Sequence, residues 1–260
     1  MRDIFSELSV PPLSDDDPVR RAQIQMRRPL PKRFYQEVTV AEADNGFAIR
    51  LDGRPIKTPG KRQLALPTRA AAELIASEWR RQVDEINPAT MPVTRMANTA
   101  IDGIENEIDA VLDDVVKFAE TDLLCYRADG PKSLVEVQAA HWDPVLAWAA
   151  QTLGARFILA EGIVHREQPR TAIEAYAGTL DKHRTALKLA ALHTITTLTG
   201  SALLALAFAE GRLTAAEAWK AAHVDEDWNI SQWGEDAEAH ARRETRWSEM
   251  QAAAVLFKSL

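Results

Sequence analysis

The sequence predicts an α+β fold in which a small N-terminal sheet-plus-helix domain precedes a larger, all-helical C-terminal domain. Segments with the alternation and turn residues of β-strands are concentrated in residues 34–66. Apolar side chains at helical spacing dominate later, and 28 of the 43 alanines follow residue 130, as expected for closely packed helices. We therefore expect a poorly ordered arm at 1–33, a small α/β domain at 34–95 and a helical domain at 96–260.

The composition fits a soluble globular protein and excludes several classes of function. The chain has 260 residues, of which 46% are hydrophobic and 27% charged, enough for a substantial core. Acidic residues outnumber basic ones by 38 to 31, a net charge of -7, whereas a protein that binds nucleic-acid phosphates should be basic. The one cysteine, Cys125, excludes an intramolecular disulfide and a multi-cysteine zinc site, and we expect it to be buried and unreactive.

The first 33 residues differ from the rest in charge and proline content. They carry seven basic and five acidic side chains, five prolines and the run Asp15-Asp16-Asp17, which is typical of a poorly ordered arm. The arm lacks the apolar core of a signal peptide, and its acids are unlike a mitochondrial presequence. We therefore expect a cytoplasmic protein.

Strand signals cluster directly after the arm. Residues 34–40 and 47–51 combine aromatic and β-branched side chains with alternation, and Asp44-Asn45-Gly46 between them predicts a β-hairpin. Residues 52–55 form a second predicted turn, and residues 64–66 a further short strand. A small antiparallel sheet should result.

A helix is predicted after this sheet. Pro67-Thr68 supplies a typical helix start and Asn87-Pro88 a stop. Trp79 is expected to pack this helix rather than to contact a partner. The helical stripe consists of Leu74, Ile75, Trp79, Val83 and Ile86.

The C-terminal domain shows three further helix starts. Residues 133–136 match the capping box, in which side chains satisfy the free amides of a helix start, and residues 214–217 give another helix start. Asp143-Pro144 combines a capping residue with a first-turn proline. An apolar helical stripe spans residues 104–118, and residues 155–163 give the only hint of an extended segment.

Residues 189–209 contain no Asp, Glu, Lys or Arg and are long enough to cross a bilayer. They nevertheless hold His193, four threonines and Gly200-Ser201 near the middle, and such polar groups are costly in lipid. We predict two buried helices separated at Gly200, with His193 hydrogen-bonded in the core.

No catalytic or cofactor-binding motif stands out. Residues 53–62 differ from a phosphate-binding loop in glycine spacing and contain two prolines, so we interpret them as a turn. The six histidines are scattered without metal-ligand spacing. We therefore predict no cofactor, no metal site and no catalytic residue.

The most informative segment for function lies near the C-terminal end. Between Asp225 and Glu238 there are six acidic residues and no basic one, interspersed with Trp228 and Trp233. One interpretation is a protein-recognition surface, because aromatic anchors dominate interface energies. The other is that both tryptophans pack in the helical core while the acids are solvated. The sequence alone leaves both open.

Seven short stretches occur in an order that points to a known family. They are residues 51–59 (LDGRPIKTP), 64–68 (LALPT), 78–79 (EW), 88–94 (PATMPVT), 98–102 (NTAID), 121–127 (TDLLCYR) and 228–234 (WNISQWG). Together they resemble the assembly chaperones of the ATP synthase F1 sector that bind the alpha subunit, over nearly everything after residue 33. The eukaryotic relatives are mitochondrial, and the unlike N-terminal arm favours a bacterial, cytoplasmic member.

The resemblance implies an ATP-independent chaperone rather than an enzyme. Such a protein would bind the newly made alpha subunit, shield the surface that later meets the beta subunit and prevent aggregation before assembly. A glutamate of the acidic stretch is important in this family; Glu226 is the best match, and the family usually has tyrosine where Trp228 stands. The candidate partner-binding residues are Glu226, Asp225, Asp227, Trp228 and Trp233.

Two other classes of function stay open. One is an enzyme with an unrecognised pocket of histidines and acidic residues in the helical domain, which a metal assay would help to reveal. The other is an interaction module for a different protein, which co-purification would identify. Neither nucleic acid binding nor membrane insertion is expected.

Overall fold

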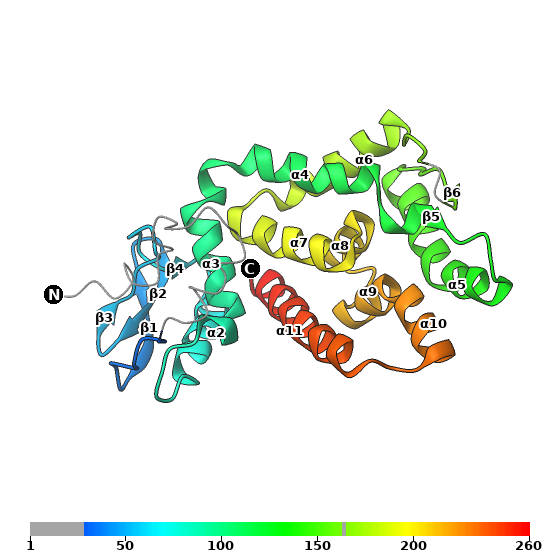
Figure 1. Cartoon of the computed structure of the whole chain (residues 1–260). Coiled ribbons are helices and arrows are strands. Elements are labelled where there is room, and N and C mark those ends of the chain that lie inside the picture. Colours follow the sequence, from blue (N-terminus) through cyan, green and yellow to red (C-terminus); the bar gives the residue numbers. More distant parts are fainter. Residues whose placement is uncertain (1–28, 163–164) are drawn as a thin grey trace, which may run out of the picture. The chain divides into compact units, whose positions relative to one another are not determined.

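A computed structural model describes residues 29–162 and 165–260, which form two compact units (Figure 1). The first unit ends at Gly103 and also includes the last two residues of the chain, and the second comprises residues 104–258. A small sheet with two helices makes up the first unit and helices dominate the second, so the predicted α+β class is confirmed. Our prediction of a poorly ordered arm falls mainly on residues 1–28, outside the described residues.

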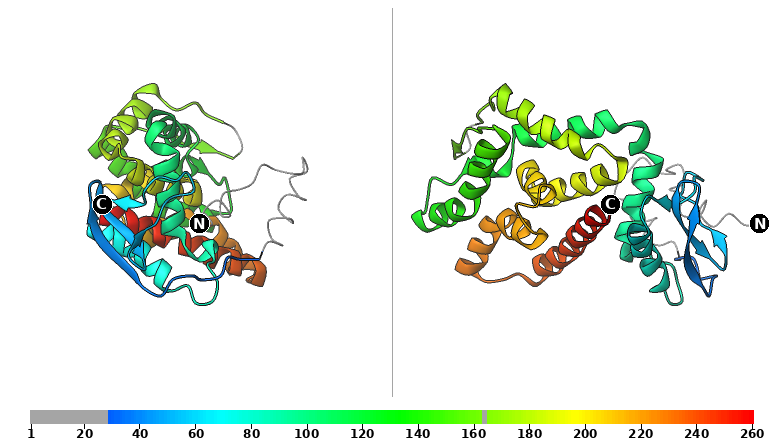
Figure 2. Two further views of the ribbon diagram at one scale, coloured as in Figure 1. Left: turned by 90° about the vertical axis from the view of Figure 1, so that its left-hand side faces the viewer. Right: turned by 180° about the vertical axis from the view of Figure 1, so that it is seen from behind.

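The first unit is built on a small antiparallel sheet, seen from behind in the right-hand view of Figure 2. The strands are β1 (Val38–Ala43), β2 (Gly46–Leu51), β3 (Arg54–Pro55) and β4 (Ala65–Leu66). β2 pairs with the other three, and the predicted β1–β2 hairpin is confirmed. At the hairpin Gly46 has a φ of +117°, and a Cβ there would lie 2.2 Å from the Leu66 carbonyl oxygen, so glycine is needed for β4 to approach β2.

The strand predicted at residues 34–40 begins only at Val38. Ahead of it, the Asp52 carboxylate accepts the backbone N–H groups of Gln36 and Glu37 at 3.0 and 2.8 Å. These two bonds lower the pKa of Asp52. The two amides are therefore bonded to the side chain of a turn instead of a neighbouring strand, which shortens β1 at its start.

Helix α2 (Arg69–Arg80) packs on this sheet and is shorter than predicted. Its predicted start is confirmed, because the Thr68 side chain accepts the Ala71 N–H at 3.0 Å. The predicted continuation to residue 86 is wrong. Val83 lies beyond the helix and is 75% exposed, while Ile86 is buried in a non-helical segment.

Residues 31–33, which we assigned to the arm, are bonded to the segment that follows α2. The Ile86 N–H donates to the Pro31 carbonyl at 2.8 Å, and the Arg33 N–H donates to the Asp84 carbonyl at 2.8 Å. This pairing keeps the segment after α2 extended. It explains why the helix ends at Arg80 although apolar residues at helical spacing extend to Ile86.

A buried carboxylate joins α2 to α3 (Pro92–Asp102). Glu78 is 1% exposed and accepts the N–H groups of Val93 and Thr94 at 2.8 Å each. These amides open α3 and have no acceptor within the helix. Burial raises the pKa of Glu78, and the bonds from α3 oppose that shift. The adjacent Trp79 is buried, with its ring centroid 5.7 Å from that of Tyr35, in keeping with a packing role.

The expected domain boundary at residue 95 falls inside α3. This helix packs on α2 and belongs to the first unit, and the two compact units divide after Gly103. That the two units are separately folding domains stays a prediction.

The second unit is almost entirely helical in its described part. Its α-helices are α4 (Ile108–Glu120), α5 (Lys132–Trp148), α6 (Arg170–Leu180), α7 (Ala186–Thr199), α8 (Ala202–Ala209), α9 (Ala215–Ala222), α10 (Val224–Trp233) and α11 (Ala237–Ser259). Two short strands, β5 (Tyr126–Arg127) and β6 (Ala160–Glu161), pair in parallel. The extended segment predicted at residues 155–163 thus contains β6.

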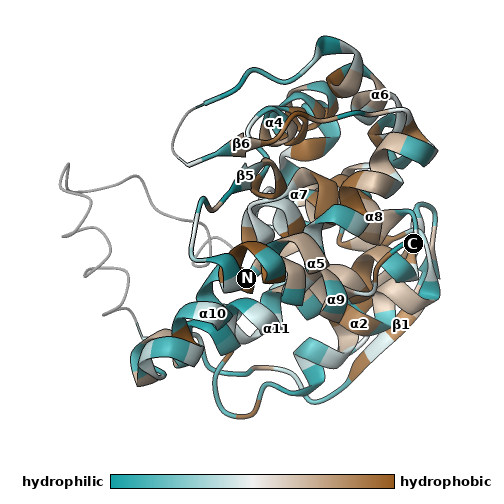
Figure 3. Ribbon diagram, turned by 90° about the vertical axis from the view of Figure 1, so that its right-hand side faces the viewer, coloured by the Kyte–Doolittle hydropathy of each residue, from teal (hydrophilic) through white to brown (hydrophobic). Residues whose placement is uncertain are grey.

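The core of this unit is centred on α7 and α8. Every residue of α8 except its last is buried, and α4 and α9 each pack on both central helices. Phe208 of α8 meets Phe257 of α11 with ring centroids 5.6 Å apart. Figure 3 shows the contrast between the hydrophobic ribbon of α8 and the largely hydrophilic ribbon of α10.

The uncharged stretch at 189–209 forms parts of two helices, as predicted. Gly200 takes a left-handed φ of +67° at the end of α7, and the Ser201 side chain caps α8 by accepting the Leu204 N–H at 3.0 Å. The helix start predicted at 214–217 is also confirmed, and a capping box is present there at the start of α9. Among the described residues, no helix has both the length and the apolar character needed to cross a membrane.

The helix start predicted at residues 133–136 lies within two residues of the observed start but lacks the capping box, and the start predicted at Asp143-Pro144 is wrong. α5 begins directly after Pro131, so residues 133–136 lie inside the helix and form no capping box. Asp143 and Pro144 also lie inside α5, where the Asp143 carboxylate pairs with Arg127 at 2.7 Å. The local signals were typical of a start, but the helix had already begun upstream.

A second buried carboxylate, Asp122, holds the start of α8. One of its oxygens accepts the Leu124 N–H at 3.0 Å and the Ser201 hydroxyl at 2.8 Å, and the other accepts the Leu203 N–H at 2.9 Å. Burial raises the pKa of Asp122 to about 6, although these bonds oppose the shift. Because α8 begins in the core, Asp122 takes the place of the water that would otherwise bind its first amides.

We predict that Asp122→Asn destabilises the protein in a pH-dependent way. An amide has one acceptor oxygen, so at least one buried donor loses its partner, at a cost of about 1–3 kcal/mol. The raised pKa means that the folded chain binds the Asp122 proton more tightly than the unfolded chain, so wild type gains stability from this group as the pH falls through about 6.

Urea unfolding of both proteins across this pH range tests the prediction. The difference in unfolding free energy between wild type and Asp122→Asn should widen as the pH is lowered from about 7 to about 5. The exposed residue Asp113 of α4 supplies the control variant Asp113→Asn. A difference that stays constant with pH would contradict the raised pKa.

Candidate protein-interaction site

Helix α10 is packed far more loosely than the central helices. Val224 is its one buried residue out of ten, whereas α8 buries seven of its eight. Most helical stability in proteins comes from packing an apolar face. A helix with so little buried apolar surface therefore needs other contacts to hold it, and its side chains stay accessible to a partner.

Two of the candidate acidic residues bond α10 to the neighbouring helices α5 and α11. Asp225 accepts a hydrogen bond from the Gln138 amide of α5 at 2.8 Å, and the buried Gln138 in turn accepts the Ala128 N–H at 2.9 Å. Asp227 pairs with Arg243 of α11 at 2.5 Å. We call the pairs Gln138–Asp225 and Arg243–Asp227 the polar clamps of α10. Asp225 and Asp227 thus have structural partners within the chain.

Glu226 lies between these acids and is held less tightly. Its carboxylate is 3.9 Å from Nε2 of His223, and 38% of the side chain is exposed. The His223 ring stacks on Trp219 with centroids 3.9 Å apart, and its Nδ1 donates to the Trp219 carbonyl at 2.7 Å. Burial lowers the pKa of His223, so the ring is neutral at neutral pH and supplies no positive charge to Glu226. Glu226 is therefore the candidate acid most available to a partner.

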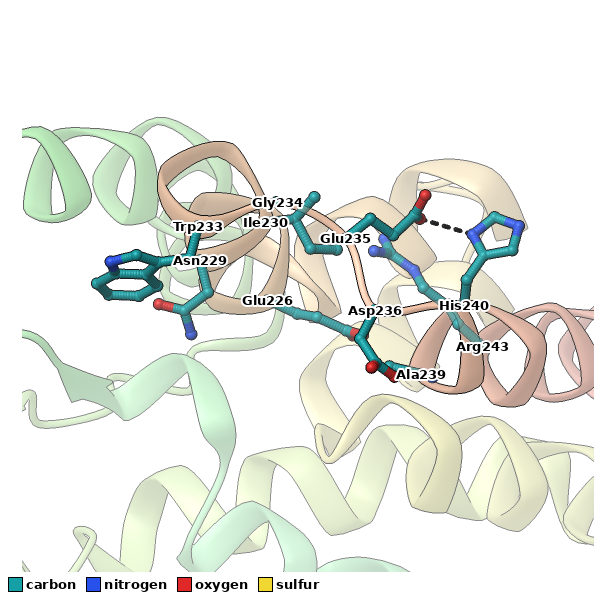
Figure 4. A pocket seen from close by; sticks show the side chains of 10 residues that line it. All are labelled: Glu226, Asn229, Ile230, Trp233, Gly234, Glu235, Asp236, Ala239, His240 and Arg243. Atoms are coloured by element: carbon teal, nitrogen blue, oxygen red, sulfur yellow. Dashed lines mark hydrogen bonds and ion pairs between the residues drawn. The ribbon is translucent and has the colours of Figure 1, made fainter.

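A groove lies between the end of α10 and the start of α11 (Figure 4), and we call it the α10–α11 groove. Its lining residues are Glu226, Asn229, Ile230, Trp233, Gly234, Glu235, Asp236, Ala239, His240 and Arg243. Figure 4 shows the Glu226 side chain extending toward Asp236, with Trp233 on the opposite side and Glu235 paired to His240. The Glu235–His240 contact measures 2.6 Å.

The core-packing interpretation of the tryptophans is wrong for Trp233. This residue is 76% exposed, and its ring meets that of Trp228 edge to face, with centroids 5.7 Å apart. Trp228 is half-buried and lines a second groove, toward α5, together with Val137 and His141. An exposed tryptophan supported by a second, half-buried one near acidic side chains is typical of a surface that binds protein.

The residues that the sequence analysis considered for catalysis or metal binding lie outside this surface. Cys125 is buried, as predicted, and burial raises the pKa of its thiol to about 12, which disfavours the reactive thiolate. His193 is partly exposed rather than in the core, and its Nε2 lies 2.9 Å from the Asp114 carboxylate of α4. Across residues 29–162 and 165–260, no three His, Cys, Asp or Glu side chains are grouped to hold a metal ion.

Gln138 and Arg243 belong to this site, and the sequence analysis selected neither. Arg243 follows the acidic stretch, so its charge alone gave a weak signal for pairing. Gln138 gave no signal, because it is a neutral amide that lies 87 residues before Asp225. Only the folded structure brings the side chains of Gln138 and Asp225 together.

Known proteins resemble the chain over nearly its whole length. A family model described as ATP12 chaperone protein matches residues 32–150. The crystal structure of Atp12 from Paracoccus denitrificans is 37% identical in sequence, with a TM-score of 0.82 over 88% of this chain and 97% of that one. The chain belongs to the ATP12 chaperone family. The Agrobacterium tumefaciens protein Atu1473 is 56% identical, with a TM-score of 0.88 over 100% of this chain and 97% of its own.

A more distant ATP12 relative is the mitochondrial protein atp12 of Schizosaccharomyces pombe. It is 23% identical over 85% of this chain and 79% of its own length. Membership of the ATP12 family makes the chain an F1-ATPase assembly chaperone and not an enzyme. The family model ends before α10, whereas the Agrobacterium structure covers this helix as part of the whole chain.

We predict that Gln138→Ala loosens α10 without unfolding the rest of the second unit. The substitution removes the bond to Asp225 and leaves the Ala128 N–H without its acceptor, at a local cost of about 1–3 kcal/mol. Amide hydrogen exchange in α10 should become on the order of tenfold faster, while α8 stays protected. Glu136→Ala, at an exposed position of α5, is the matched control. Unchanged exchange in α10 would show that this clamp does not hold the helix.

Proposed function

We propose that the chain binds the free alpha subunit of the ATP synthase F1 sector and shields the surface that this subunit later presents to the beta subunit. ATP12 family membership supports the chaperone role. The observation that carries the choice of site is the exposed Trp233 on the same helix as Glu226, a partly exposed carboxylate that forms no ion pair with a Lys or Arg among the described residues. The bonds of Asp225 and Asp227 hold α10 in place. Trp228 adds aromatic area next to Trp233.

The physical need for such a chaperone follows from the client. A subunit of an obligate ring exposes an apolar interface before assembly, and exposed apolar patches aggregate. The chaperone must cover this patch and still be displaced by the true partner, so its contact has to be weaker than the final interface. Helix α10 suits this task, because its tryptophans offer apolar area while its acids keep the free chaperone from self-association. In a bacterial cell we place this step in the cytoplasm.

Co-expression of the chain with the alpha subunit, without the beta subunit, tests the proposal. We expect the alpha subunit to become soluble and to elute with the chain as a one-to-one complex in the absence of added ATP. Addition of the beta subunit should release the chain. If the alpha subunit stays insoluble and no complex forms, the proposal is wrong, and a different co-purifying protein would identify another client.

Glu226→Lys should keep the fold and lose most of the alpha-subunit binding. The side chain is partly exposed, so solvent accommodates the lysine. The charge reversal turns attraction at the groove into repulsion, and we expect the yield of soluble alpha subunit to fall on the order of tenfold.

The control for this variant is Glu120→Lys, at the exposed end of α4. Both variants should melt like wild type, and the control should solubilise the alpha subunit fully. If Glu226→Lys solubilised the alpha subunit fully, Glu226 would not be part of the contact surface.

A further inference from the structure

We propose that the groove between α5 and α10 receives one large apolar side chain of the client, and that a carboxylate of the same client segment pairs with Lys220. This inference rests on the proposed function and specifies which chemistry of the alpha-subunit surface is recognised. We call this site the α5–α10 groove. Its lining comes from three helices and includes Val137 and His141 of α5, Lys220 of α9, and Val224, Asp227 and Trp228 of α10.

The exposed tryptophan of α10 borders this groove. Figure 4 shows the Trp233 indole directed away from Glu226 and Asp236. The ring meets that of Trp228 edge to face, with centroids 5.7 Å apart, and Trp228 lines the groove. Because 76% of Trp233 is exposed, its ring continues the apolar lining out to the solvent. Aromatic side chains in such a position contribute most of the energy of many protein interfaces.

The groove has room for one large side chain. Its volume is about 220 Å³, and an engineered apolar cavity of about 150 Å³ is large enough to bind benzene. Val224 is buried and Trp228 is half-buried, so these parts of the lining are held in place before the client binds. Little conformational freedom is therefore lost when a leucine or phenylalanine side chain enters.

The charged groups that face the groove leave one positive charge unpaired. Asp227 is paired with Arg243 of α11 at 2.5 Å, and the ring of His141 is bonded through Nδ1 to the Val137 carbonyl at 3.0 Å. Lys220 is exposed in the last turn of α9 and forms no ion pair within the described part of the chain. A carboxylate of the client is the group that complements this ammonium.

Other kinds of client segment fit the groove less well. A cationic segment would be repelled by Lys220 and would find no free carboxylate in the lining, because Asp227 is already paired. A purely apolar segment would fill the groove without using Lys220. Exposed ion pairs contribute modestly to affinity, so the apolar side chain should account for most of the binding. The carboxylate should act mainly on orientation and on the rate of association.

The apolar contact is tested on the complex of the full chain with the alpha subunit. Val137 is 37% exposed, so Val137→Glu should fold and melt like wild type. The new carboxylate would lie in the apolar groove, and the dissociation constant should rise on the order of tenfold. Trp233→Ala removes the indole at the border and should have an effect of similar size. Val255→Glu, at a 48% exposed position of α11, is the matched control and should bind like wild type.

The charge contact is tested by Lys220→Glu. Reversal of the charge should raise the dissociation constant about three- to tenfold, chiefly through slower association at low salt, and added NaCl should diminish the difference from wild type. The matched control is Lys117→Glu, because Lys117 is also an exposed lysine in the last turn of a helix, α4. This control makes the same change in net charge and should leave binding unchanged.

The outcomes separate this inference from the function on which it rests. Failure of the wild-type chain to bind the alpha subunit would overturn the proposed function. If wild type binds and Val137→Glu binds equally well, the function stands and the groove is not the contact, whatever the effect of Trp233→Ala. Weaker binding by Val137→Glu, with Lys220→Glu indistinguishable from Lys117→Glu, would show a purely apolar occupant and overturn the carboxylate pairing. Tighter binding by Lys220→Glu would overturn it in favour of a cationic segment.

Discussion

Helix α8 begins inside the helical core, where its first amides cannot reach water, and the carboxylate of Asp122 is the acceptor that makes this arrangement stable. Three donors from two segments converge on it. Each would cost about 1–3 kcal/mol if it were buried without a partner. Because α4, α7 and α9 all pack against α8, the positions of these helices depend on this one side chain.

In the first unit a carboxylate binds backbone or side-chain donors at each end of α3. Glu78 binds its first amides, and Asp102 at its other end accepts the Thr58 hydroxyl at 2.6 Å and the Gly60 N–H at 2.7 Å. Glu78, Asp102 and the acid that caps α8 all lie in stretches through which the sequence resembles its family. Those stretches therefore reflect the need to satisfy hydrogen-bond donors of the fold, whereas the stretch that contains Trp233 contributes an exposed surface.

Features set by neighbouring residues were predictable from the sequence, and features set by distant partners were not. The hairpin at Gly46 and the cap at Thr68 were confirmed, because each depends on a few adjacent residues. Pro144 was misplaced as a helix start, since nothing local shows that α5 begins upstream. For the site, composition alone selected the acidic and aromatic segment, but the exposure of Trp233 and the bond from Gln138 depend on which surfaces α10 meets after folding.

The polar clamps determine how α10 would detach from the body of the protein. A helix held by apolar packing exposes that surface to water when it leaves, which is strongly unfavourable. The bonds of Gln138 and Arg243 are instead exchanged for bonds to water, at a modest net cost. Helix α10 should therefore separate from the body of the protein at a lower cost in free energy than a helix of the apolar core.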